Sequence, residues 1–141
     1  MIRYILGAAV SVTLLVCPAE AAENYPDLRG TWTGQADAVF IGPSGQSRIG
    51  ENSDKQPATF GSAEFKLIVE KQKDRRFSGT VTVQNWTKQI VGAVFKNGFI
   101  RWAEPGGFVE AELTARDTLQ TCYIRASEFS QMVSCAKLER Q

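Results

Sequence analysis

Apolar and polar residues alternate in short runs through most of the chain after residue 23. Phe65, Leu67 and Val69, for example, alternate against Lys66 and Glu70, and no stretch has the period of an amphipathic helix. Because successive side chains of a strand point to opposite faces, this pattern predicts β-strands with one buried face. Turn residues separate the runs, and Asn97-Gly98 is the strongest short hairpin signal among them. We expect strands over residues 30–41, 63–72, 77–84, 88–96, 99–104, 108–115, 118–126 and 131–140.

Short turns join nearly all of these eight strands, which predicts an all-β fold of sequential hairpins. Eight such strands close naturally into an antiparallel up-and-down β-barrel, which also removes exposed sheet edges. A two-sheet sandwich is the alternative, but its crossovers need longer loops than the sequence offers. One connection is long, at residues 42–57, and contains Gly, Pro and Ser with almost no apolar residue. We interpret it as a lid over the barrel or as a plain surface loop.

The first 21 residues differ from the rest and have the features of a secretory signal peptide. Arg3 precedes an uncharged run at residues 4–16, which is too short for a membrane-spanning helix. The small residues around Ala21 suit a signal peptidase, so we expect a single domain over residues 22–141, without a membrane span. An uncut anchor, or lipidation at Cys17, remains as an alternative. We therefore expect a periplasmic or secreted protein.

Two cysteines, Cys122 and Cys135, remain after the signal peptide is removed, in a compartment that favours disulfides. If Ala126 pairs with Gln131 across the last turn, the two cysteines lie directly opposite each other on neighbouring strands. A cross-strand disulfide is feasible at such a pair. A metal site is the weaker alternative, because two thiols without His or further Cys bind zinc poorly.

Charge and composition exclude several classes of function. Of the 141 residues, 16 are Lys or Arg and 15 are Asp or Glu, which argues against nucleic-acid binding through bulk charge. The chain has no histidine, so Ser-His-Asp and Cys-His catalysis and His-ligated zinc are impossible. We expect a protein that is not an enzyme and holds no cofactor or metal.

A short motif at the start of the first strand carries a family resemblance. The segment Leu28-Arg29-Gly30-Thr31-Trp32-Thr33-Gly34 resembles the opening of lipocalins and of avidins, which are eight-stranded barrels that hold small ligands. Bacterial inhibitors of secreted metalloproteases have a similar start and share the barrel. The chain also resembles uncharacterised exported proteins of alphaproteobacteria. That similarity rests on the opening, on residues 75–80 and 90–92, and on the cysteine-bearing end. The later lipocalin motif is missing, and the biotin contacts of avidins have no counterpart.

The resemblance implies that a basic residue late in the chain packs over the opening tryptophan. Arg140 is the first candidate and Arg125 the second. Independently of the family, the large ring of Trp32 would plug one barrel end, and Gly30 would let a long side chain approach. We therefore assign Gly30, Trp32 and Arg140 a structural role at a barrel end.

Aromatic and apolar residues of the middle strands are the candidate ligand contacts. Trp102 and Ile100 share one strand face, Trp86 lies at a strand break where a barrel mouth would be, and Phe95 precedes a hairpin turn. Such residues suit a small apolar ligand held in the barrel. Alternatively they simply fill it. The corresponding functions are a small-ligand carrier, an inhibitor or interaction module for an envelope or secreted protein, and a structural envelope protein.

Overall fold

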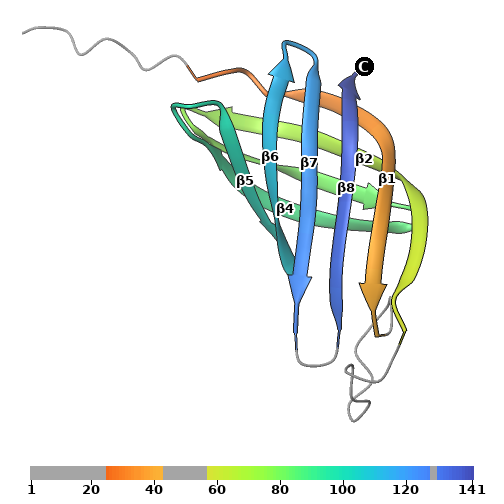
Figure 1. Ribbon diagram of the computed structural model, residues 1–141. Helices are drawn as coiled ribbons and strands as arrows, with labels where there is room; N and C mark the ends of the chain where they lie inside the picture. Colours follow the sequence, from red (N-terminus) through yellow and green to blue (C-terminus); the bar gives the residue numbers. More distant parts are fainter. Residues whose placement is uncertain (1–24, 43–56, 128–129) are drawn as a thin grey trace, which may run out of the picture.

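Eight antiparallel strands close into a barrel in which each strand pairs with its sequence neighbours and the last pairs with the first (Figure 1). The computed structural model describes residues 25–42, 57–127 and 130–141. The strands are β1 (Gly30–Ile41), β2 (Thr59–Lys73), β3 (Arg76–Val83), β4 (Trp86–Val94), β5 (Phe99–Glu104), β6 (Gly107–Ala115), β7 (Thr118–Ala126) and β8 (Gln131–Arg140). The predicted up-and-down barrel is confirmed, and the sandwich is excluded.

Side chains from all eight strands fill the middle of the barrel. The alternation seen in the sequence places every second residue inside, where it is shielded from water. Burial of these side chains is the main stabilising contribution to the fold. The largest fully buried side chains are Trp32, Leu28, Leu67, Ile100, Leu119, Leu138, Val81, Val94 and Val109.

The ladder between β4 and β5 is short, and this leaves a split in the barrel wall. It holds four residue pairs, from Val91↔Ala103 to Val94↔Ile100, whereas the β1–β2 ladder holds eleven. β5 has six residues and β4 has nine, so β4 extends past the end of its partner. Residues 86–90 of β4 therefore have no ladder partner on the β5 side within the described strands.

The predicted disulfide joins the last two strands. Cys122 and Cys135 are directly paired in the β7–β8 ladder, with a Cα–Cα distance of 4.0 Å. Ala126 pairs with Gln131, as the sequence predicted. The bridge lies on the outer face, because the neighbouring Thr121 and Tyr123 of β7 are buried inside.

Two strands differ from the sequence prediction by more than one residue at a boundary. β2 begins at Thr59 instead of Ala63, because its first four residues pair with the end of β1 although all four are exposed and show no alternation. β4 spans Trp86–Val94 instead of 88–96, since the tight turn at Gln84, with a φ of 52°, lets the chain re-enter the sheet earlier.

The expected signal peptide (residues 1–21) with Cys17, and most of the expected lid at residues 42–57, lie outside the described residues. Among the residues that the structure does describe, no helix is long and apolar enough to cross a membrane.

Candidate ligand-binding site at the open end of the barrel

The end of the barrel where β1 begins is plugged, and we call it the closed end. Trp32 has an exposed fraction of 0% there, and its indole Nε1 donates a hydrogen bond to Leu28 O at 2.8 Å. The Arg140 guanidinium carbon lies 4.2 Å from the centroid of the Trp32 ring. Its Nη1 and Nη2 donate to Arg29 O at 2.6 Å and to Asp27 O at 2.7 Å. Ring, guanidinium and N-terminal segment together close this end.

Two further contacts fix the plug. Gln72 accepts a hydrogen bond from Leu28 N and donates one to Pro26 O, each at 2.8 Å. Gly30 has a φ of 125°, which disfavours other residues, and a Cβ at this position would lie 3.7 Å from Arg140 Nη1. The glycine therefore sets the backbone turn from the plug into β1.

The opposite end, where β1 ends, carries polar side chains on inward-facing positions, and we call it the open end. Arg125 continues the inward series of β7 after Tyr123, and Glu104 continues that of β5 two residues after Trp102. Lys88 pairs with the buried Val81 and so also faces inward. We name Lys88, Glu104, Tyr123 and Arg125 the polar cluster.

Glycine positions the tyrosine of this cluster. A Cβ at Gly107 would lie 2.6 Å from Tyr123 Cε2, so the ring can cover the start of β6 only because no side chain stands there. A Cβ at Gly106 would lie 3.7 Å from the Tyr123 hydroxyl, which therefore points toward the β5–β6 turn. Burial raises the pKa of Tyr123, the negative charge of Glu104 raises it further, and Arg125 lowers it. Tyr123 is thus a neutral hydroxyl between two opposite charges.

Glu104 and Lys88 face each other across the split in the wall. Burial raises the pKa of the Glu104 carboxyl, and the charge of Lys88 partly offsets this effect. Lys88 Nζ donates a hydrogen bond to Pro105 O at 3.4 Å, which links β4 to the turn that follows β5. The lysine thus bridges the two strands where their backbone ladder has ended.

Several buried donors at and below the open end have no acceptor. Among the described residues, nothing accepts a hydrogen bond from Arg125 Nε, Arg125 Nη2 or Trp102 Nε1, although all three atoms are shielded from solvent. Buried donors are nearly always paired in native proteins, and each exception requires an explanation. The three nitrogens can only donate, so what they lack is an acceptor.

Small side chains form the inner wall next to Tyr123. Tyr123, Ser134, Ala38 and Gly61 are successive cross-strand neighbours from β7 to β2. Ser134 and Ala38 are half-buried and Gly61 is exposed, whereas inward-facing residues in the middle of the barrel are buried. Solvent therefore reaches the inside of the barrel at the open end.

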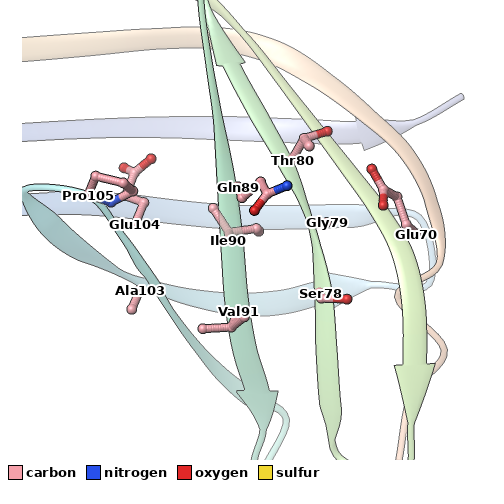
Figure 2. Close-up of a pocket in the computed structure, with 10 residues that line it drawn as sticks. All are labelled: Glu70, Ser78, Gly79, Thr80, Gln89, Ile90, Val91, Ala103, Glu104 and Pro105. Atoms are coloured by element: carbon pink, nitrogen blue, oxygen red, sulfur yellow. The ribbon is translucent and has the colours of Figure 1, made fainter.

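A groove lies on the wall at the split, with a volume of about 390 Å³. Figure 2 shows Glu104 and Pro105 on one side of β4, and Thr80 and Glu70 on the other. Glu104 belongs both to this groove and to the polar cluster, so the groove and the open end share a residue. The groove is lined by Glu70, Ser78, Gly79, Thr80, Gln89, Ile90, Val91, Ala103, Glu104 and Pro105.

The four residues that the sequence suggested as ligand contacts do not share one place. Ile100 and Trp102 are 0% and 2% exposed and belong to the filled core. Trp86 lies at the open rim with 62% of its surface exposed. Phe95 lies at the closed end, where it lines a shallow hollow with Tyr25. Only Trp86 borders the open end directly.

The arginine ranked second for packing over Trp32 lies far from it. Arg125 is at the C-terminal end of β7, whereas Trp32 is at the start of β1 beside the end of β8. The polar cluster itself was not predicted. The sequence of β7 contained a signal for it, because every second residue of a strand lies on the same face. The face that contains Leu119, Thr121 and Tyr123 ends in the charged Arg125.

The outer surface carries an apolar row that crosses seven strands. Each of its members is directly opposite the next in the ladders, and Phe60, at 79%, is the most exposed of the large ones. The row departs from the alternation of buried apolar and outward polar residues that antiparallel sheets commonly show. The row runs Val91, Ala103, Phe108, Ile124, Val133, Val39 and Phe60.

No protein-family model matches the sequence, and no curated protein or solved structure matches it significantly.

Proposed function

We propose that this protein is an exported binding protein that takes a small ligand at the open end of its barrel. The proposal rests mainly on one observation: buried hydrogen-bond donors of Arg125 and Trp102 have no acceptor among the described residues. Arg125 lies at the end that solvent reaches, whereas Trp102 lies in the buried core below it. A ligand with acceptor atoms at the open end would satisfy the donors of Arg125.

This proposal places the ligand at the mouth and not in the centre. Core side chains such as Trp32, Leu67 and Ile100 occupy the middle of the barrel and are 0–1% exposed. Eight-stranded barrels hold either side chains or one small ligand, and here side chains are packed inside. We therefore expect a small ligand that lies against the inner wall of the open end, above the packed core. Its polar part would lie near Arg125 and its apolar part near the rim.

The proposed role is binding without catalysis, in the periplasm or outside the cell. The absence of histidine from the sequence removes the commonest general base. The disulfide between Cys122 and Cys135 suits an oxidising compartment. The signal-like first 21 residues support the same location.

The first experiment is native mass spectrometry of the mature protein purified from its own envelope. We expect a small mass that is present in the native spectrum and lost on denaturation. Ala38→Leu, which enlarges an inward-facing residue of the open end, should lower its occupancy, whereas Asp37→Leu, on the outer face of the same strand, should not. Thermal melting checks that both variants fold. Equal native and denatured masses for the wild-type protein would contradict the proposal.

The outer apolar row favours a second candidate, an interaction module for another protein. Phe60, Val39 and Val133 form a contiguous exposed patch of large apolar side chains on β2, β1 and β8. Such patches on soluble proteins commonly mark interfaces. A photo-crosslinking residue at Val133, compared with one at the exposed Gln120, would test this candidate in cells. A protein-sized adduct at Val133 alone supports it, and equal or absent adducts oppose it.

A further inference from the structure

We infer that the ligand of the open end is a small monocarboxylic acid whose carboxylate pairs with Arg125. This inference rests on the proposed function, since it names the class of ligand that the same site takes. Three features of the structure carry it: the unpaired guanidinium, the charge of the polar cluster and the apolar neighbours of the arginine.

One edge of the Arg125 guanidinium lacks the acceptors that a planar anion could supply. Its Nε and Nη2 are shielded from solvent and have no acceptor among the described residues. These two nitrogens form one edge of the guanidinium fork, which matches the two oxygens of a carboxylate. Arginine keeps its charge at all physiological pH values, and Arg125 is half-buried, so a negative partner is the natural acceptor for its two shielded nitrogens. A carboxylate supplies both the acceptors and the charge.

The net charge of the polar cluster favours a ligand with a single negative charge. Lys88 and Glu104 carry opposite charges, and the charge of Lys88 lowers the pKa of Glu104 across the split. Arg125 therefore leaves the cluster with a net charge of about +1 when all three are ionised. A monoanion neutralises this charge, whereas a dianion such as phosphate would face the carboxylate of Glu104 with an uncompensated charge. The remaining donors, Trp102 Nε1 and the Tyr123 hydroxyl, are neutral.

The neighbours of Arg125 favour an apolar body on the acid. Arg125 pairs with Met132, and Met132 pairs with Phe40 in the next ladder. Both partners are half-buried, although they lie on inward-facing positions. Trp86 adds an exposed indole at the rim. An acid with an aromatic or short aliphatic body can place its carboxylate on Arg125 and its body against these side chains.

Isothermal titration calorimetry on the mature, oxidised protein tests the inference with 2-naphthoate and its neutral isostere 2-naphthamide. We expect 2-naphthoate to bind at least about tenfold more tightly, as a charge-assisted pair predicts. Arg125→Gln should abolish this preference, because it weakens the binding of 2-naphthoate much more than that of 2-naphthamide. Thermal melting checks that the variant folds. Arg116→Gln makes the same charge change at an exposed turn of the closed end and should keep the preference.

Equal affinities for the two probes, or a preference that survives in Arg125→Gln, would overturn the carboxylate inference and leave the proposed function standing. If neither probe binds, the inference is tested on the compound that the envelope-purified protein releases on denaturation, which mass spectrometry identifies. A released compound with one carboxyl group supports the inference, and a compound without one overturns it. If no small mass is released and neither probe binds, the inference and the proposed function both fail.

Discussion

The guanidinium of Arg140 lies over the ring of Trp32 and joins the last strand to the first at the closed end. The distance from the guanidinium carbon to the ring centroid is 4.2 Å, and the two residues are directly paired in the β1–β8 ladder. Arg140 also donates to two backbone carbonyls of the plug, on Arg29 and Asp27. Its Nε also lies 3.0 Å from Asp117 Oδ1. One side chain therefore joins β8 to β1, to the N-terminal segment and to the turn between β6 and β7.

Removing this arginine should destabilise the fold. Arg140→Ala loses a shielded cation–π contact, two hydrogen bonds to carbonyls and an ion pair with the exposed Asp117, which together predict a loss of about 2–3 kcal/mol. Arg140→Lys keeps the charge but not the forked donors, so we expect an intermediate loss. Urea unfolding followed by tryptophan fluorescence measures both. Arg116→Ala is the control, and an Arg140→Ala variant as stable as that control would show that the plug does not stabilise the barrel.

The disulfide should stabilise the barrel to a similar degree. Cys122 and Cys135 are 13 residues apart, and a loop of this length predicts about 2–3 kcal/mol from restriction of the unfolded chain. The double variant Cys122→Ala/Cys135→Ala should therefore unfold at a lower urea concentration. A reducing agent should lower the midpoint of the wild-type protein and leave the double variant unchanged. Equal midpoints of the two proteins without reductant would contradict this expectation.

Glu104 should make the stability depend on pH. Burial raises the pKa of its carboxyl in the folded state above the value of 4.5 that applies when it is exposed. The folded protein therefore holds this proton more tightly than the unfolded chain does. Stability should consequently fall as the pH rises from about 4.5 through the raised pKa, and then level off.

The variant Glu104→Gln isolates this effect, because glutamine cannot titrate. It should be more stable than the wild type at neutral pH, and its stability should decrease less between pH 4.5 and pH 7. Glu112→Gln makes the same charge change at an exposed position of β6. Thermal melts at several pH values compare the three proteins. Parallel pH profiles for wild type and Glu104→Gln would show that Glu104 is not the responsible group.

The sequence was sufficient for the fold because the information is local. Alternation identified each strand, short turns fixed the order, and the turn between Ala126 and Gln131 set the register that opposes Cys122 to Cys135. Strand boundaries were less certain where alternation fades, as at the exposed start of β2.

The site could not be derived in the same way because it depends on distant parts of the chain. Lys88, Glu104 and Arg125 come from three different strands, and the closure of the barrel brings them to one end. The plug depends on contacts such as Leu28 to Gln72, which are 44 residues apart. Which end of the barrel is open follows from these long-range contacts and not from any local pattern.

Two glycines of neighbouring segments should respond very differently to substitution by alanine. A Cβ at Gly92 would lie 2.7 Å from Trp102 Cβ and would collide with the Phe77 ring. Phe77 and Trp102 pack edge to face in the core, with ring centroids 6.4 Å apart, so neither can move without opening the core. Overpacking of this kind predicts a loss of about 2–3 kcal/mol for Gly92→Ala.

Gly98→Ala is the matched comparison. No atom outside its two chain neighbours lies within 4 Å of the position that its Cβ would take, so the added methyl group meets open space. Its φ of 79° still disfavours alanine, which predicts a smaller loss of about 1 kcal/mol from backbone strain alone. Urea unfolding of both variants separates collision from strain. A Gly92→Ala variant no less stable than Gly98→Ala would mean that Phe77 and Trp102 can repack, and that the interior has room for a ligand in its centre as well as at its open end.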